Sequence, residues 1–370
     1  MRRLVALDLP GGRTFVEQLE RAWADGDAVL PLDQRLPHEA RHALCRRLGV
    51  EFVIGPDRQR TRLDEGWGVE GDDALVVATS GSTGMAKGVV LTHQAVAASA
   101  SATSERLGVT ADDHWLACLP LSHVGGLSVI TRALHTGTRL TVHSGFDARA
   151  VERSGATLVS LVATALQRID SSRFRTILLG GSRPPSDRPA NTVTTYGMTE
   201  TGSGVVYDRR PLDTVEIRIV DDEVQLRCPM LFRCYRDGTT PFTSDGWYPT
   251  GDLGTIGGDG LLSVHGRRGD LIISGGENVW PEPIEAVLGA HPGVEDAAIV
   301  GVPDAEWGEI VTALIVPADR GALPVLGELR EAVKNHLPAF CAPRRVVFCD
   351  ELPRTTLGKL KREELAGRAD

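Results

Sequence analysis

A short segment rich in glycine and hydroxyl side chains most constrains how this chain can fold. Residues 79–88 read TSGSTGMAKG and directly follow an apolar run at 74–78, which we predict to be a buried strand. Glycines let a backbone bend tightly and turn several N–H groups toward one anion. The hydroxyls can donate to phosphate oxygens, and Lys87 adds a positive charge. The segment therefore predicts a phosphate-binding loop at the carboxyl end of a strand, where α/β sheets bind ligands.

Two plainer interpretations compete with this one. The spacing of Gly81 and Lys87 does not fit the GxxxxGK[ST] pattern of P-loop proteins, so a P-loop is excluded. A flexible surface loop is the remaining alternative, and further motifs have to decide against it.

Apolar runs predict the class of fold around this loop. Between residues 50 and 200, short apolar runs alternate with helical patterns, including a helix that should begin near Thr92. Such alternation indicates an α/β region with a mostly parallel sheet. Residues 14–50 are predicted to be helical, ahead of a short strand at 50–54.

The pattern changes in the second half of the chain. From 214 to 275, short alternating strands separated by Gly and Asp turns predict a small β subdomain. An α+β pattern follows, with helices expected at 281–290 and 326–337. We therefore expect a domain boundary near 267–270.

Composition limits the partners of the protein. The formal net charge is −9, which argues against nucleic acid or an anionic membrane as the main partner. No apolar run reaches the roughly 18 residues of a membrane-spanning helix. The six cysteines form no CxxC pair, and no HExxH pattern occurs, so we predict reduced thiols in a cytoplasmic protein without a zinc site.

Further motifs follow the loop along the chain. In order they are LPLSHVGG (119–126), LGGS (179–182), TYGMTET (195–201), YPTGD (248–252), GRRGD (266–270), GGEN (275–278) and PRTTLGK (353–359). Together with TSGSTGMAKG they resemble the acyl-activating, or adenylate-forming, superfamily, which includes acyl-CoA synthetases, adenylation domains of non-ribosomal peptide synthesis and firefly luciferase. The resemblance spans residues 79 to 361. It implies a large N-terminal domain at 1–267 with mostly parallel sheets and a small β subdomain, and a mobile α+β C-terminal domain at 270–370.

The resemblance also implies roles for individual residues. ATP would be bound by Thr79, Ser80, Gly81, Ser82, Thr83, Gly84, Lys87, Gly181, Ser182, Tyr196, Gly197, Asp252 and Arg267. Catalysis would involve Lys359, Thr199 on the α-phosphate, Glu200 on Mg²⁺, and His123 beside the substrate carboxylate. A carboxylate suits Mg²⁺, because this hard cation prefers oxygen ligands and bridges phosphates.

The implied reaction has two steps and one moving domain. A carboxylate attacks the α-phosphorus of ATP, pyrophosphate leaves, and a thiol then attacks the acyl-AMP. Between the steps the C-terminal domain would rotate, exchanging Lys359 for the thiol-channel residues Gly275, Gly276 and Glu277. The pivot usually carries Asp or Lys; here the matching position is Gly269, which can absorb a large change in φ and ψ. Ala86 is a second departure, since a proline usually precedes the lysine of the phosphate loop.

The acid is the least constrained part of the prediction. The short chain resembles the o-succinylbenzoate–CoA ligases of menaquinone synthesis, so we expect o-succinylbenzoate, ATP, Mg²⁺ and coenzyme A as ligands. The distal carboxylate of that acid needs a cation or donors when buried. His123, Arg168 and Gly197 would line its pocket, with Arg168 as the anchor; the alternative for Arg168 is an ordinary surface arginine.

Other functions stay open at this point. The acceptor thiol could belong to a separate carrier protein, the acid could be another small aromatic or short-chain one, or the protein could bind acyl-adenylates without catalysis. Retention of Lys87, Glu200, Asp252, Arg267 and Lys359 argues against the last. The sequence leaves self-association undecided.

Overall fold

The computed structural model describes residues 2–80, 86–181, 184–185, 187–354 and 360–368. The chain divides into two compact units. The first comprises Met1–Arg218, Gln225–Pro249 and Ile256–Leu262, and the second comprises Ile219–Val224, Thr250–Thr255 and Ser263–Asp370. Each unit is described separately below.

The first unit contains two seven-stranded sheets, and the first of these holds the N-terminal residues. Its order is β16-β6-β5-β2-β1-β3-β4. The central strands are parallel, while the β5–β6, β6–β16 and β3–β4 pairs are antiparallel. The strands are β1 (Leu4–Leu7), β2 (Ala28–Pro31), β3 (Phe52–Ile54), β4 (Arg60–Arg62), β5 (Asp73–Ser80), β6 (Ala86–Thr92) and β16 (Cys234–Tyr235).

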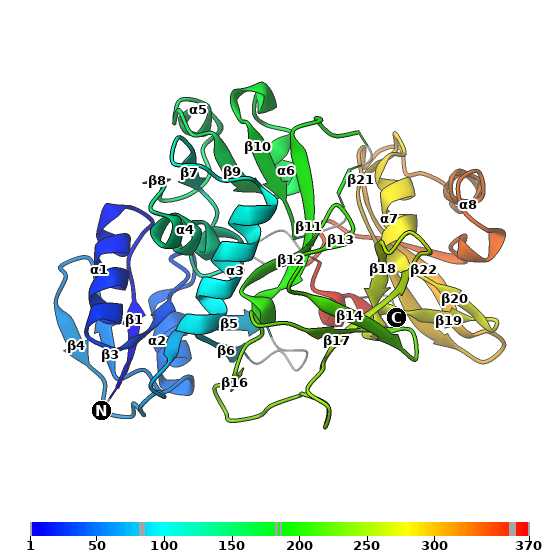
Figure 1. Cartoon of the computed structure of the whole chain (residues 1–370). Helices are drawn as coiled ribbons and strands as arrows, with labels where there is room; N and C mark the ends of the chain where they lie inside the picture. The colour runs from blue at the N-terminus through cyan, green and yellow to red at the C-terminus, as the bar shows by residue number, and fades with distance from the viewer. Residues whose placement is uncertain (1, 81–85, 182–183, 186, 355–359, 369–370) are drawn as a thin grey trace. The chain divides into compact units, whose positions relative to one another are not determined.

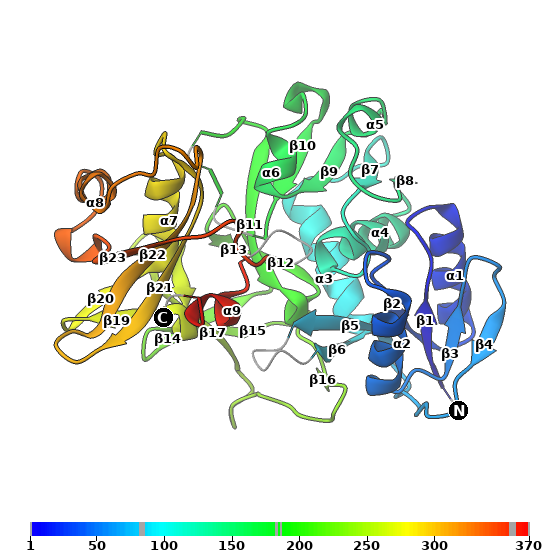
Figure 2. The ribbon, with the colours of Figure 1, turned by 180° about the vertical axis from the view of Figure 1, so that it is seen from behind.

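Helices cover both faces of this sheet. Figure 1 shows α1 (Arg13–Ala24) on one face, and Figure 2, from behind, shows α2 (His38–Arg47) on the other. Coverage on both faces explains why all four residues of β1 and of β2 are buried. The prediction of continuous helix over 14–50 was therefore wrong in its middle, where β2 separates two helices.

The second sheet has the order β13-β12-β11-β10-β9-β7-β8. Its strands from β8 to β11 are parallel, and β12 and β13 extend it antiparallel. The strands are β7 (His114–Ala117), β8 (Arg139–Val142), β9 (Leu158–Leu161), β10 (Thr176–Leu179), β11 (Thr192–Met198), β12 (Ser203–Tyr207) and β13 (Arg210–Pro211). The α/β class with mostly parallel central strands is thus confirmed.

Two helices lie between these sheets. α3 (His93–Arg106) contacts β5 and β6 of the first sheet and β12 of the second, and α4 (Val124–Thr136) packs beside α3 against β7, β8 and β9 (Figure 1). α3 begins as predicted, because the hydroxyl of Thr92 accepts a hydrogen bond from the Ala95 N–H at 3.1 Å. The short helices α5 (Ala148–Glu152) and α6 (Ala163–Leu166) belong to the β8–β9 and β9–β10 connections.

The predicted strands between 214 and 275 form a small sheet. Its order is β14-β15-β17-β18, with the strands β14 (Glu216–Val220), β15 (Glu223–Arg227), β17 (Tyr248–Ile256) and β18 (Leu262–Arg267). This confirms the small β subdomain, while β17 was not predicted as a strand.

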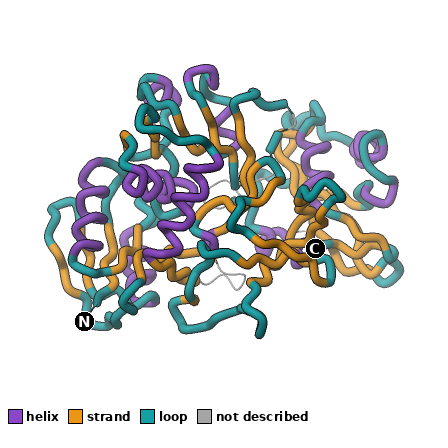
Figure 3. Tube along the Cα trace, viewed as in Figure 1, coloured by secondary structure: helices purple, strands orange, loops and turns teal. Residues whose placement is uncertain are grey.

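The C-terminal part of the second unit has the α+β organisation expected. Strands dominate it (Figure 3), led by the long antiparallel pair β21 (Val294–Asp304) and β22 (Gly308–Pro317). The other elements are β19 (Ile272–Ser274), β20 (Glu277–Val279), β23 (Arg345–Phe348), α7 (Pro281–Gly289), α8 (Leu326–Lys334) and α9 (Arg362–Ala366). Ile284 and Leu288 of α7 and Leu329 of α8 share an apolar core with the sheet.

None of the described helices has the length and apolar character to cross a membrane.

Candidate active site

The predicted phosphate loop connects two paired strands, β5 and β6. β5 and β6 pair antiparallel with Thr79 opposite Lys87 and Ser80 opposite Ala86, so the loop residues join two hydrogen-bonded strands. Gly81, Ser82, Thr83 and Gly84 lie outside the described residues. The sequence correctly indicated an apolar strand before the loop, but it missed β6 between the loop and α3. The hairpin fixes Lys87 at the first residues of β6, beside the loop.

The TYGMTET motif forms a tight turn. β11 ends at Met198, a 3₁₀ turn holds Thr199–Thr201, and β12 returns from Ser203. A Cβ on Gly197 would lie 2.2 Å from the Ser203 carbonyl oxygen, so only glycine fits there. The Thr201 hydroxyl accepts from the Met198 N–H at 3.0 Å and lies 2.7 Å from the Ser203 carbonyl oxygen. This turn holds Thr199 and Glu200 half-buried.

A third segment brings these two motifs together. The Tyr235 hydroxyl donates to Oε1 of Glu200 at 2.9 Å, and Nζ of Lys87 lies 4.9 Å from the centroid of the Tyr235 ring. The Phe232 N–H donates to the Glu200 carbonyl oxygen at 2.8 Å. β16 carries Tyr235 beside β6, with Tyr235 opposite Val89. The predicted metal carboxylate and the predicted phosphate lysine therefore share one side chain as a neighbour, and sequence analysis missed it.

His123 lies where α4 begins. Its main chain occupies the N-cap position, and its half-buried ring has Nε2 3.9 Å from Oδ2 of Asp33. Burial raises the pKa of Asp33, but hydrogen bonds and charge from Arg35, with His123 contributing, outweigh it and leave the pKa lowered. A carboxylate thus accompanies His123 that no motif indicated.

The predicted acid anchor, Arg168, and the predicted ATP-binding residue Gly181 lie on the connections that follow β9 and β10. Arg168 follows α6, is exposed, and has its guanidinium carbon 5.1 Å from the centroid of the Phe146 ring. No carboxylate of the described residues forms an ion pair with Arg168. Gly181, at φ +90°, follows β10, and Ser182 lies outside the described residues.

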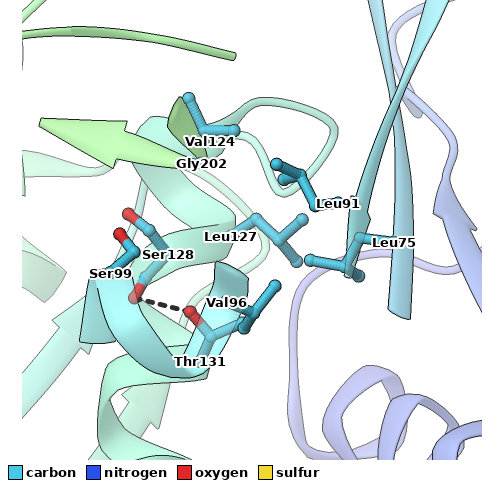
Figure 4. A pocket seen from close by; sticks show the side chains of 9 residues that line it. All are labelled: Leu75, Leu91, Val96, Ser99, Val124, Leu127, Ser128, Thr131 and Gly202. Atoms are coloured by element: carbon cyan, nitrogen blue, oxygen red, sulfur yellow. Dashed lines mark hydrogen bonds between the residues drawn. The ribbon is translucent and has the colours of Figure 1, made fainter. Parts of the chain in front are cut away.

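The first unit also contains a cavity. Figure 4 shows it between the β5–β6 hairpin, α3 and α4, with Leu75, Leu91, Val96, Ser99, Val124, Leu127, Ser128, Thr131 and Gly202 as its lining. These are mostly apolar side chains, and none of the described residues that we predicted for the site is among them. We assign no ligand to this cavity.

Two of the predicted ATP-binding residues, Asp252 and Arg267, pair with each other in the second unit. Nε of Arg267 lies 2.8 Å from Oδ1 of Asp252, whose side chain is only 7% exposed. The Thr250 hydroxyl accepts from the Asp252 N–H at 3.0 Å and donates to the Val224 carbonyl oxygen at 2.8 Å. Asp252 is therefore a buried carboxylate in a fixed orientation.

The predicted pivot lies between two separately held residues of the same unit. Arg268 donates to the Asp221 carbonyl oxygen at 2.9 Å, and Arg362 pairs with Asp270 at 3.1 Å. Burial raises the pKa of Asp270, although Arg362 and Arg267 oppose the effect. A Cβ on Gly269 would meet no atom within 4 Å.

The predicted thiol-channel residues form an exposed hairpin turn. Gly275 (φ +61°) and Gly276 (φ +84°) connect β19 to β20, with Ser274 opposite Glu277. Two positive φ values in a two-residue hairpin turn explain the glycine pair. Lys359 lies outside the described residues.

Known proteins share this chain's sequence and fold. Residues 67–230 match the AMP-binding enzyme family, and residues 283–359 match the AMP-binding enzyme C-terminal domain. The chain is 39% identical over 353 residues to a probable 2-succinylbenzoate–CoA ligase of Mycobacterium tuberculosis, covering 86% of this chain and 90% of that protein.

Solved structures agree. The o-succinylbenzoate CoA synthetase from Bacillus subtilis, in complex with the acyl-adenylate OSB-AMP, superimposes with a TM-score of 0.87 at 28% identity, covering 99% of this chain and 88% of that one. The same enzyme in complex with ATP and a magnesium ion gives a TM-score of 0.85 at 28% identity, covering 99% and 90%. This chain therefore belongs to the AMP-binding enzyme family and, within it, to the 2-succinylbenzoate–CoA ligases.

Proposed function

We propose that this protein activates o-succinylbenzoate with ATP and transfers the acyl group to coenzyme A, as a step of menaquinone synthesis. The observation that carries the proposal is the meeting of Lys87 and Glu200 around Tyr235 in a chain of this family. A lysine next to a phosphate loop and a carboxylate without an ion pair among the described residues suit a metal-bound triphosphate.

The residues also suit Mg²⁺. Glu200 is half-buried, and one of its carboxylate oxygens accepts from Tyr235. Among the described residues, no group of three or more His, Cys, Asp or Glu side chains is arranged to hold a metal ion, and we propose that Glu200 would hold it together with phosphate oxygens. When bound, the ion would neutralise charge on the phosphates.

In the first step, an oxygen of the aliphatic carboxylate forms a bond to the α-phosphorus as the bond to pyrophosphate breaks. The loop and Lys87 hold the β- and γ-phosphates, Thr199 donates to the α-phosphate, and Lys359 neutralises charge between the two anions. Lys359 stays protonated, because it bridges anions. Asp252 orients the ribose by accepting from its hydroxyls.

In the second step, the thiol sulfur of coenzyme A bonds to the acyl carbon and AMP leaves. We propose that the C-terminal domain, 270–370, turns about Gly269 between the steps. The exposed Gly275–Gly276 turn and Glu277 would then face the thiol. The contacts of the residues on either side of Gly269, Arg268 with Asp221 and Asp270 with Arg362, support this choice of pivot.

We propose a cytoplasmic enzyme. All six cysteines are free, and burial raises the pKa of Cys45 and of Cys118 to about 12. Unreactive, unpaired thiols suit a reducing compartment.

The test is AMP formation from ATP, Mg²⁺ and coenzyme A across a panel of acids: o-succinylbenzoate, benzoate, fatty acids and amino acids. We expect turnover with o-succinylbenzoate alone. Turnover with another acid would contradict the proposed substrate. Transfer of the acyl group only to a carrier protein would contradict coenzyme A as the acceptor. If no acid supported pyrophosphate exchange, the protein would bind acyl-adenylates without catalysis.

Arg168→Ala in the same assay tests the acid anchor. We expect its KM for o-succinylbenzoate to rise on the order of tenfold or more, because an unpaired buried carboxylate is costly. Arg173→Ala is the matched control, since Arg173 is also exposed and pairs only with nearby Asp170 among the described residues. An unchanged KM in Arg168→Ala would remove Arg168 from the pocket.

A further inference from the structure

Tyr235 has no role in the proposed reaction, yet it lies beside two residues that do. Its hydroxyl touches the proposed metal ligand, and its ring face lies next to the proposed phosphate lysine. We propose that Tyr235 is a positioning residue, which orients the Glu200 carboxylate for the metal and holds Lys87 at the phosphate loop. The inference rests on the proposed function, because it assigns a role within that same site.

The hydroxyl restricts Glu200. The Tyr235 O–H occupies Oε1 at 2.9 Å, while the Phe232 N–H holds the Glu200 main chain at 2.8 Å. One four-residue segment, 232–235, therefore holds both the main chain and the carboxylate of Glu200. Because hydrogen bonds to charged groups are stronger than neutral ones, this contact can select one rotamer of Glu200.

The ring restricts Lys87 in a different way. An ammonium 4.9 Å from the centroid of a tyrosine ring is attracted to the π face. The contact leaves the donors of Lys87 that point away from the ring available for phosphate. The charge of Lys87 also acts on Asp237. Hydrogen bonds from Thr239 are the main cause of the lowered pKa of Asp237, and the positive charge of Lys87 lowers that pKa further.

Tyr235 itself is rigidly held, as a positioning residue has to be. Its main chain pairs with β6, and its N–H donates to the Thr239 carbonyl oxygen at 2.9 Å. Its ring lies 4.9 Å from that of Phe232, which also packs against Phe242 and Tyr248, each 5.3 Å away. The aromatic cluster therefore fixes the position of the Tyr235 side chain, which contacts both Glu200 and Lys87.

Two substitutions separate the two contacts. Tyr235→Phe removes the hydroxyl and keeps the ring, whereas Tyr235→Leu removes both. Tyr207→Phe is the matched control, because it also removes a tyrosine hydroxyl with a 2.9 Å hydrogen bond, to Thr103, away from Glu200 and Lys87. Calorimetric titration of each full-length protein with ATP in EDTA, and with ATP at increasing Mg²⁺, measures binding without turnover.

For Tyr235→Phe we expect the Mg²⁺ concentration at half-saturation to rise on the order of tenfold, as for loss of a hydrogen bond to a charged group. Its affinity for ATP in EDTA should stay unchanged. Tyr235→Leu should also weaken binding in EDTA, and Tyr207→Phe should change neither. Urea unfolding shows whether each variant is folded.

Several results would overturn the inference. Unchanged Mg²⁺ dependence in Tyr235→Phe would do so, as would an equal loss of affinity with and without Mg²⁺, which is the pattern of a purely structural role. If the unsubstituted protein binds ATP with Mg²⁺ and Tyr235→Phe behaves identically, only this inference fails. If the unsubstituted protein binds no ATP at all, the proposed function fails with it.

Discussion

Asp113 ties three parallel strands together with one carboxylate. It precedes β7, and it accepts from Thr157 at 2.7 Å, just before β9, and from Arg175 at 3.0 and 2.8 Å, just before β10. The Thr110 N–H is a further donor at 2.9 Å. These contacts lie at the amino ends of the strands, whereas the residues around His123, Arg168 and Gly181 follow the carboxyl ends. The sheet is thus fastened at the end away from its functional loops.

This network predicts a pH-dependent stability. Burial raises the pKa of Asp113, but Arg175, Thr110 and Thr157 outweigh it and hold the pKa below the ordinary value of 3.8. The ionised carboxylate therefore stabilises the fold above that value, and the contribution is lost as pH falls through the folded pKa. At pH 7, Asp113→Asn should lower the free energy of unfolding by about 2 kcal/mol.

Urea unfolding at a series of pH values measures this difference. The gap between the unsubstituted protein and Asp113→Asn should narrow as the pH falls from neutral to below 3.8. Asp112→Asn, at the exposed neighbouring position, should have little effect at any pH. A gap of constant size would contradict the assigned role of the charge.

Single elements show what the sequence could and could not predict. α7 and α8 were predicted close to their observed bounds, and α3 was predicted to begin where it does. β2 was missed, because four consecutive buried residues have no period that separates a strand from a buried helix. β6 was missed because its pairing with β5 is decided by the hairpin, not by its own pattern.

The same distinction applies to the candidate site. Motifs indicated Lys87 and Glu200 separately, since each lies in a recognisable local string. Their common neighbour Tyr235 depends on β16 pairing with β6, which joins residues more than 140 positions apart. Contacts made by tertiary pairing leave no local signal, and the Asp33–His123 contact was missed for the same reason.

The first turn of α4 gives a prediction at this scale. A Cβ on Gly126 would lie 2.5 Å from the Leu119 carbonyl oxygen and 2.6 Å from that of Pro120. Both are main-chain atoms, so Gly126→Ala has to shift the loop that carries His123. We expect a loss of about 1–3 kcal/mol in the free energy of unfolding, as for overpacking, and a higher KM for the acid.

Gly125→Ala is the matched control for stability. Its Cβ would meet only the Leu119 side chain, at 3.6 Å, which is an ordinary contact. Denaturant unfolding of both variants, with steady-state kinetics in the acid, checks the prediction. Equal stability of the two variants would contradict the prediction, because the loop would then move without a loss in the free energy of unfolding.

At the scale of the whole molecule, the proposed rotation of the C-terminal domain requires a pivot in the main chain. The C-terminal family match begins at residue 283, and the predicted boundary at 267–270 precedes it. Arg268 is tethered to the β14–β15 turn through Asp221, and Asp270 to α9 through Arg362. Gly269 is the residue between these tethers.

Gly269→Pro tests the pivot. Proline fixes φ near −65° and restricts Arg268 before it, so the variant should favour one conformation of the segment over the other. Formation of the CoA ester should fall on the order of tenfold or more, and the rates of the two half-reactions should fall unequally. Gly269→Ala, which has free space for its Cβ, should stay near the unsubstituted rate.

Pyrophosphate release measures the first half-reaction, and transfer from prepared acyl-AMP to coenzyme A measures the second. Equal loss in both, in a variant that unfolds at the normal urea concentration, would mean that the chain turns elsewhere, because a blocked pivot cannot slow both steps alike while each domain remains intact.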